Sequence, residues 1–428
     1  MPEMFRRGIE PAIRSAMDAA SVVIIEGGRA VGKSTTCRTL AAESGWAAPL
    51  DLTDPGLIDS IRLNPVRYLA TLPRPTIIDE AQLLPELPIW VKRVVDDRGG
   101  ATGQFILTGS ARLGRHQLGG SDPLAGRSLR LRMWPLTPGE RAGNVVPIAE
   151  RLFDDEVPAF TSTDSRAGPD WQRGGLPGLP GVLVPGDSGV WERAMGAYVE
   201  SVLPLGPNSS RVDQGRLMRT FRYLASNPGQ QLNLGRMASE LQVKADTARS
   251  YLEALEACFL LFRAEAHRPL EHRVLTAHPR IYATDVGLAT WAARMIDRPA
   301  TPTEIGGLIE NDVAVALSSS CDWGRERIAV RHWRDERAKR EVDLLLVHPD
   351  GRSVPIEVKA AEHVGPSETA GLLAFASDNP GSFHRGYLVY QGHGVVDLSP
   401  PDMPDASIVA IPIGHLLGGT PADRSPGR

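Results

Sequence analysis

Short apolar runs and segments with helical spacing alternate along the first 140 positions of the chain. The apolar runs predict five strands, which are expected at 22–25, 46–52, 75–80, 104–110 and 128–134. Helices are expected at 1–20, 35–42, 57–70 and 86–97. Strands that alternate with helices predict an α/β fold, in which a parallel sheet carries helices on both faces.

The pattern changes after position 140. Residues 141–190 are rich in Gly, Pro, Asp and Ser and contain only short apolar runs, which predicts a loop-rich connector. Helical spacing resumes at 191–203, where a helix is expected.

Residues 213–265 have the spacing of three short helices followed by a strand. Leu217, Phe221 and Leu224 share one helical face, and the turn residues 227–229 (NPG) end that helix. The later elements of this unit are expected at 234–241, 245–257 and, as a strand, 259–262. This order of elements is typical of a winged helix.

The third of these helices carries charges of both signs. Basic Lys244 and Arg249 stand beside acidic Asp246, Glu253 and Glu256. Because DNA phosphates favour a net positive surface, this balance favours a protein-contact or structural role, with DNA binding as the alternative.

The last globular unit is expected at 304–395. Its pattern predicts helices at 305–317 and near 367–377. Strands are expected at 328–333, 341–347, 354–359 and 386–390. The tail after Leu417 is rich in Gly, Pro and Arg and is expected to be disordered.

Composition narrows the class of protein. The length of 428 residues predicts about two to four domains. The net charge of −4 and the pI near 6.2 indicate no general attraction to nucleic acid. The three cysteines, Cys37, Cys258 and Cys321, fit no metal spacing and indicate a reducing compartment. No apolar run approaches the roughly 18–20 residues that cross a bilayer, so a cytoplasmic protein without a membrane partner is expected.

The segment 27–34, GGRAVGKS, satisfies the pattern G-x-x-x-x-G-K-[ST] and lies between an expected strand and an expected helix. This is the context that a phosphate-binding loop requires. Its N–H groups and the helix N-terminus would face the anion, Lys33 would reach the β- and γ-phosphates, and Ser34 would hold Mg²⁺. The expected cofactors are therefore ATP and Mg²⁺. The residues expected to bind the nucleotide are Gly27, Gly28, Arg29, Ala30, Val31, Gly32, Lys33, Ser34, Thr35 and Ser110.

Two further strand ends supply polar groups to this site. Asp79 and Glu80 close the third strand, where Asp79 is expected to bind the metal and Glu80 to activate water. The fourth strand ends in Thr108 and Ser110, and it is expected to lie between the first and third strands. Either side chain could sense the γ-phosphate, or the pair could simply end the strand. The expected catalytic residues here are Lys33 and Glu80.

A second group of polar residues is expected in the last unit. Glu357 and Lys359 are two apart on one strand and share a face, and Asp343 lies on the strand before a hairpin at 349–351. Glu310 comes from the preceding helix. Asp343 and Glu357 could bind Mg²⁺ and, with Lys359, direct a water at a phosphodiester. The alternative is an ion-paired sheet surface.

Nine segments, in order, resemble the bacterial and archaeal P-loop ATPases in which an AAA-type module precedes a winged helix and domain of unknown function 4143 (DUF4143). They are GGRAVGKST, TIIDEAQ, FILTGSA, AGRSLRLRMWPLTPGE, GGLP, RIYATDVGLA, GGLIEN, EVD and IEVK. The resemblance covers most of residues 5–395. It implies a cytoplasmic ATP-binding protein whose last module is similar to restriction-endonuclease folds. It also implies that the nuclease-like pattern is carried by Glu310, Asp343, Glu357 and Lys359.

The predicted fold class is therefore α/β: a P-loop NTPase parallel sheet, a winged helix and a restriction-endonuclease-like α/β module. The expected domains are 1–140 (ATPase), 141–205 (connector and lid-like helices), 206–270 (winged helix), 271–417 (endonuclease-like) and 418–428 (disordered tail). Three functions stay open. They are ATP hydrolysis that controls the C-terminal region, a metal-dependent DNA nuclease regulated by ATP, and an ATP-gated scaffold that binds DNA or protein. An oligomer is compatible with each.

Overall fold

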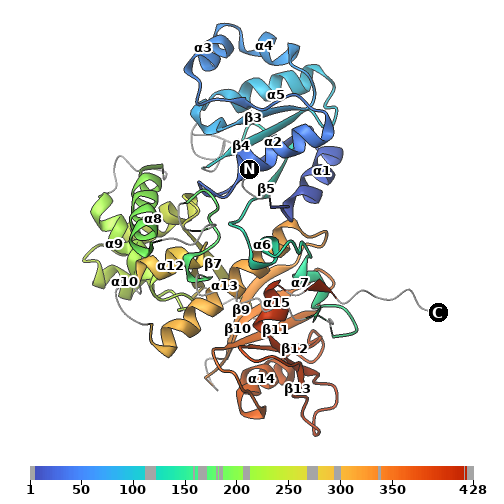
Figure 1. The fold of residues 1–428 in the computed structure, drawn as a ribbon, viewed down its shortest axis with the longest axis vertical. Helices are drawn as coiled ribbons and strands as arrows, with labels where there is room; N and C mark the ends of the chain where they lie inside the picture. The colour runs from blue at the N-terminus through green and yellow to red at the C-terminus, as the bar shows by residue number, and fades with distance from the viewer. Residues whose placement is uncertain are drawn as a thin grey trace, which may run out of the picture.

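The computed structural model describes residues 5–110, 122–157, 160–161, 171–179, 182, 187–205, 213–267, 278–293, 300–335, 339–418 and 420–421. Positions 422–428 of the expected tail lie outside this part of the chain. Figure 1 shows an N-terminal sheet with its helices, a group of helices from α8 (Ser188–Val202) to α12 (Val286–Ala292), and a C-terminal sheet.

The N-terminal sheet has five strands, all parallel, in the order β2-β3-β4-β1-β5. They are β1 (Val22–Glu26), β2 (Leu50–Asp51), β3 (Thr76–Asp79), β4 (Phe105–Gly109) and β5 (Ser128–Arg132). This confirms the predicted α/β fold with a parallel sheet. It also places β4 between β1 and β3, so that the polar ends of these three strands meet at one edge.

Helices cover both faces of this sheet (Figure 1). They are α1 (Ile9–Ala19), α2 (Lys33–Ser44), α3 (Pro55–Leu63), α4 (Pro65–Thr71) and α5 (Leu87–Asp97). Side chains of β1 alternate between two cores: Val23 and Ile25 pack with α1 and α2, whereas Val22 and Ile24 pack with α3, α4 and α5. Burial on both faces explains why the strands are continuous apolar runs.

Two predictions in this region are wrong in their bounds. The helix expected at 57–70 is two helices, because Pro65 disfavours the helical conformation at Asn64, which has φ −154° and ψ 78°. The strand expected at 46–52 is only the two residues of β2. A turn follows at once, in which the Asp51 carboxylate accepts a hydrogen bond from the Thr53 N–H at 2.9 Å.

The connector contains more regular structure than predicted. It includes the short helices α6 (Pro138–Arg141) and α7 (Ile148–Arg151), and β6 (Phe160–Thr161) pairs with β15 (Thr420–Pro421). Backbone pairing therefore orders two residues of the tail that the composition predicts to be disordered. Helix α8 begins at Ser188, three positions early, because the Asp187 carboxylate caps its first turn.

The three predicted short helices are present, as α9 (Gln214–Ala225), α10 (Leu234–Glu240) and α11 (Ala245–Ala257). Leu217, Phe221 and Leu224 are buried in one core, as predicted. The next strand is β7 (Leu261–Ala266) rather than 259–262, because Phe259 has a left-handed backbone (φ +57°) that ends the helix. It pairs antiparallel with β8 (Arg280–Ala283), which the sequence pattern does not predict.

The C-terminal sheet has eight strands of mixed direction in the order β13-β14-β12-β11-β10-β9-β7-β8. Its other members are β9 (Ala329–Asp335), β10 (Arg340–Val347), β11 (Ser353–Lys359), β12 (Gly386–Tyr390), β13 (Val396–Asp397) and β14 (Ile408–Pro412). We call α9 to α12, with β7 and β8, the helical unit. Because β7 pairs with β9, the helical unit and the last unit share one sheet. The exact domain boundaries stay predictions.

The helices that pack on this sheet include α13 (Pro302–Trp323), α14 (Ala370–Asp378) and α15 (Ile413–Gly418). Short 3₁₀ turns lie at Ala81–Leu83, Trp171–Arg173, Leu203–Leu205 and Pro366–Thr369. Within the described ranges, no helix combines the length and the apolar character needed to cross a membrane.

Candidate functional site

The GGRAVGKS loop leaves β1 at Gly27 and enters α2 at Lys33. A side chain at Gly27 would collide with neighbouring backbone, since its Cβ would lie 2.3 Å from the Met133 carbonyl oxygen. Gly32 has φ +100°, a conformation that favours glycine, and it turns the chain into the first helical turn. Both motif glycines are therefore required by the path of the loop, which ends at the N-terminus of α2.

The Lys33 ammonium lies against the loop itself. Its Nζ donates hydrogen bonds to the carbonyl oxygens of Gly27 (2.9 Å) and Gly28 (2.7 Å), and the residue is only 4% exposed. Burial lowers the pKa of Lys33 to about 8, although the carboxylates of Glu80 and Asp79 oppose this shift. The ammonium thus lies close enough to both acids to be affected by their charge.

The outward-facing carbonyl groups of the loop are bound by three other segments. The Tyr198 hydroxyl on α8 donates to the Arg29 carbonyl (3.2 Å), and the Gly178 N–H donates to the Ala30 carbonyl (3.1 Å). Arg7 Nη1 donates to the Val31 carbonyl at 2.6 Å. These contacts fix the loop from outside, and none of the three donors is marked by a motif in the sequence.

Arg7 also joins the loop to the segment after β5. Its Nη2 donates to the Trp134 carbonyl (2.7 Å), and its Nε forms a 2.9 Å ion pair with Glu140. Both partners of the ion pair are buried, at 5% and 0% exposure. Arg7 therefore holds together the N-terminal segment, the loop and α6.

We expect Arg7→Ala to lower the free energy of unfolding by about 3 kcal/mol, because it leaves the buried Glu140 carboxylate without its cation. Denaturant unfolding checks this value. Arg14→Ala is the matched control, since the Arg14–Glu43 pair is 45% and 52% exposed and is worth at most about 1 kcal/mol. Equal losses in the two variants would contradict the role given to Arg7.

The end of β3, the turn after it and the end of β4 place five polar side chains together. Thr108 donates to Asp79 Oδ1, and Ser110 donates to Glu80 Oε2 at 3.2 Å. Gln82 Nε2 donates both to Glu80 and to Ser110 Oγ, the latter at 3.0 Å. The structure thus brings Ser110 to the carboxylate pair, as the expected strand order requires.

Gln82 is a polar partner that the motif analysis misses. Its only sequence signal is its position two residues after Glu80, in the DEAQ segment. Glu80 itself has a left-handed backbone (φ +54°), which turns the chain sharply out of β3. The turn and the Gln82 amide together orient the Glu80 carboxylate.

The remaining loop residues have different surroundings. Arg29 and Thr35 are exposed, and Ser34 is half-buried in the first turn of α2. Asp79 is 5% exposed. A serine hydroxyl and a carboxylate are hard oxygen donors of the kind that Mg²⁺ takes beside nucleotide phosphates, so these residues suit the expected metal.

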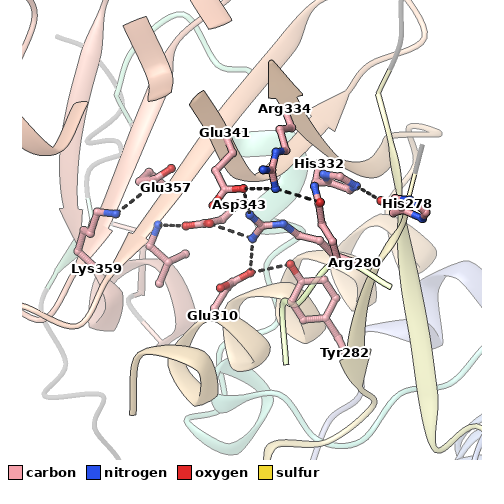
Figure 2. Close-up of polar contacts among 12 residues, drawn as sticks. His278, Arg280, Tyr282, Glu310, His332, Arg334, Glu341, Asp343, Glu357 and Lys359 are labelled. Carbon is pink, nitrogen blue, oxygen red and sulfur yellow. Dashed lines mark hydrogen bonds and ion pairs between the residues drawn. The ribbon is translucent and has the colours of Figure 1, made fainter. Parts of the chain in front are cut away.

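The second predicted constellation is also assembled (Figure 2). Lys359 Nζ donates to Glu357 Oε1 at 2.6 Å, and the Val358 N–H donates to Asp343 Oδ2 at 2.9 Å. Arg280 on β8 donates from one nitrogen, Nη1, to Asp343 Oδ1 (2.9 Å) and to Glu310 Oε1 (2.8 Å). Arg280 is absent from the predicted site, and its only signal is that it begins the RIYATDVGLA segment.

Burial raises the pKa values of two acids of this constellation, Glu310 and Glu357. Burial first, and then the charge of Asp343, raises the pKa of Glu357 to about 8 and that of Glu310 to about 7. The described residues contain no group of three or more His, Cys, Asp or Glu side chains arranged to hold a metal. The expected metal ligands Asp343 and Glu357 are thus near each other, but Asp343 is bound by a guanidinium.

Three family models match successive parts of the chain. An AAA domain matches residues 19–142, a domain of unknown function (DUF8612) matches 206–298, and the domain of unknown function DUF4143 matches 305–416. The model that covers the helical unit does not bear on the expected winged helix.

Two curated relatives resemble nearly the whole chain. They are uncharacterized proteins of Mycobacterium bovis and Mycobacterium tuberculosis, each 27% identical over 421 residues, which are 96% of this chain and 84% of the relative. Among solved structures, RuvB of Thermotoga maritima matches with 18% identity and a TM-score of 0.28, over 60% of this chain and 88% of that one. The AAA match agrees with the parallel sheet and the glycine loop and supports a nucleotide-binding P-loop domain. Residues 19–142 are therefore similar to an AAA domain and residues 305–416 to the DUF4143 domain, in the order that the sequence motifs predict.

Proposed function

We propose that the protein binds ATP with Mg²⁺ at the 27–34 loop and hydrolyses the ATP. The observation that carries this proposal is the position of Lys33, whose ammonium is buried within the loop and influenced by Asp79 and Glu80. A triphosphate in the loop would give that ammonium an anionic partner, and charge-assisted hydrogen bonds are strong where water is excluded.

Each residue of the site has one part in the proposed reaction. The loop N–H groups and Lys33 bind the phosphates. Ser34 and Asp79 would hold Mg²⁺, which would supply positive charge beside the phosphate oxygens. Glu80 accepts a proton from the water that attacks the γ-phosphorus, and the bond from that phosphorus to the ADP oxygen breaks. Ser110 orients the Glu80 carboxylate by the hydrogen bond described above.

The outer face of the loop offers a route from the nucleotide to the rest of the chain. Tyr198 and Gly178 belong to the connector, and both bind loop carbonyl groups. A change in the loop's path on nucleotide binding would alter these contacts. We therefore propose that the nucleotide state controls the position of the helical and C-terminal units.

A protein partner for the helical unit is favoured over DNA. Two of its arginines are paired with acids, since Arg249 lies 3.9 Å from Asp246 and Arg263 binds Glu256. Arginines that are neutralised in this way add little attraction for phosphates. This pairing supports the ATP-gated scaffold as the second candidate function.

Removing Mg²⁺ with EDTA is expected to lower ATP turnover by at least about 100-fold, because phosphoryl transfer depends on the metal to offset charge on the phosphates. Release of inorganic phosphate measures the rate, which should return when Mg²⁺ exceeds EDTA. Turnover that persists in EDTA would contradict the role of the metal. A protein that binds no ATP in Mg²⁺ would contradict the proposed function itself.

A further inference from the structure

Of the two carboxylates that the sequence assigns to a metal in the last unit, Asp343 binds Arg280 and Glu357 binds Lys359 (Figure 2). Besides the two bonds from Nη1, Arg280 Nη2 lies 3.3 Å from Glu341 Oε2. The side chain is 5% exposed, so one buried cation serves three carboxylates. Arg280, Glu310, Glu341 and Asp343 form what is termed here the Arg280 cluster.

The carboxylate oxygens that face Arg280 are already bound by donors of the chain. Asp343 binds Arg280 through Oδ1 and the Val358 N–H through Oδ2. Glu310 Oε1 accepts from Arg280 and also from the Tyr282 hydroxyl, at 2.8 Å. A divalent metal held jointly by Glu310 and Asp343 would need the position of the Arg280 nitrogen, since the same two oxygens face it. The residues present therefore do not fit a metal while Arg280 is in place.

The cation and the carboxylates come from different units. Arg280 and Tyr282 lie on β8, within the DUF8612 match, whereas the three acids lie within the DUF4143 match. The turn at Gly229, within the DUF8612 match, also lies against Glu310 in the DUF4143 match, because a Cβ on Gly229 would be 2.4 Å from Glu310 Oε1. The cluster is thus a contact between the two units.

We infer that the guanidinium of Arg280 is the resident cation of the DUF4143 carboxylate site and that it excludes a divalent metal from this site. With β8 in place, the site is an ion-paired contact rather than a metal centre. Loss of the guanidinium would free the oxygens of Glu310 and Asp343 that bind it, and Glu357 Oε2 is already buried without a hydrogen-bond partner. Three carboxylates without a cation are a ligand set suited to Mg²⁺ or Mn²⁺.

Titration with Mn²⁺ without nucleotide, followed by the EPR signal of free Mn²⁺, tests this inference on the full chain. Arg280→Ala is expected to bind one Mn²⁺ at least about tenfold more tightly than the wild type, because it removes the competing cation. Adding Asp343→Asn to that variant should abolish the gain. A wild-type protein that binds one Mn²⁺ equally well, and loses it on Asp343→Asn, would overturn the inference.

Arg334→Ala is the matched control for charge. Arg334 lies 3.6 Å from Glu341 at the edge of the cluster, and it is 33% exposed. The Arg334→Ala substitution removes the same charge but leaves Arg280 between Glu310 and Asp343, so it should not create a Mn²⁺ site. Equal Mn²⁺ binding by both arginine variants would mean that general charge, and not the position of Arg280, excludes the metal.

A second measurement covers the case in which Arg280→Ala does not fold. In a site built for a metal, the acids repel one another when no metal is bound, so Asp343→Asn would raise the melting temperature in EDTA. In an arginine-centred cluster it removes a partner of a buried cation, and a fall of at least about 3 °C is expected. Asp402→Asn is the control, because Asp402 is exposed on the same unit and lies outside the cluster. A rise, or no change, would overturn the inference, and neither result bears on ATP hydrolysis.

Discussion

Lys33→Ala is expected to weaken ATP binding by at least about 100-fold, because hydrogen bonds from a charged donor contribute about 1.5–3 kcal/mol each. The wild-type ammonium is buried against the loop carbonyl groups. Its removal should therefore directly eliminate hydrogen bonds to the bound phosphates. Isothermal titration with ATP and Mg²⁺ measures both affinities.

Lys244→Ala is the matched control for the loss of one lysine. Lys244 is exposed at the start of α11, in the helical unit, and its replacement should leave the ATP affinity unchanged within about twofold. An unchanged affinity in Lys33→Ala would remove the loop from nucleotide binding. A comparable loss in both variants would indicate a general effect of charge.

The affinity of the wild type should also depend on pH. Burial lowers the pKa of Lys33 to about 8, so the ammonium is largely present below pH 8 and is lost above it. A bound triphosphate favours the charged form and raises that pKa. By linkage, the contribution of Lys33 to the ATP affinity is constant well below pH 8 and is lost as the pH rises above it. The residual affinity of Lys33→Ala should lack this dependence on pH.

Glu80→Gln is expected to lower turnover by about 10²–10⁴-fold while ATP binding changes little, because the amide cannot accept the proton of the attacking water. The amide preserves the size of the side chain and can still accept from Ser110. Single-turnover release of phosphate measures the chemical step, and titration with ATP measures binding.

Glu43→Gln is the control for this variant, since Glu43 is 52% exposed on α2 and its ion pair is with the exposed Arg14. Its turnover should equal that of the wild type. Wild-type turnover in Glu80→Gln would assign the general base to another group. Loss of ATP binding in the same variant would instead assign Glu80 to the binding of nucleotide.

The elements of the proposed nucleotide site could largely be located from the sequence because they are local. A strand, a glycine loop and a helix are contiguous, and Asp79 and Ser110 each follow a short apolar run. Parallel pairing then brings the ends of β1, β3 and β4 to one edge. The polar residues at these strand ends therefore indicate that the three strands are neighbours.

The residues that were missed act through contacts between distant positions. Arg7 and Glu140 are 133 positions apart, and Arg280 and Asp343 are 63 apart. An isolated arginine in an arginine-rich chain carries no local signal that it is buried. The strand that positions Arg280 is only four residues long, too short for a clear alternation of polar and apolar positions.

A crystal structure with Mg²⁺ and a non-hydrolysable ATP analogue tests the central claim most directly. The account predicts that the β- and γ-phosphates lie within the 27–34 loop, with Lys33 Nζ turned from the Gly27 and Gly28 carbonyls to the phosphate oxygens. An analogue bound elsewhere, or a loop that keeps its Lys33 contacts at saturating analogue, would contradict it.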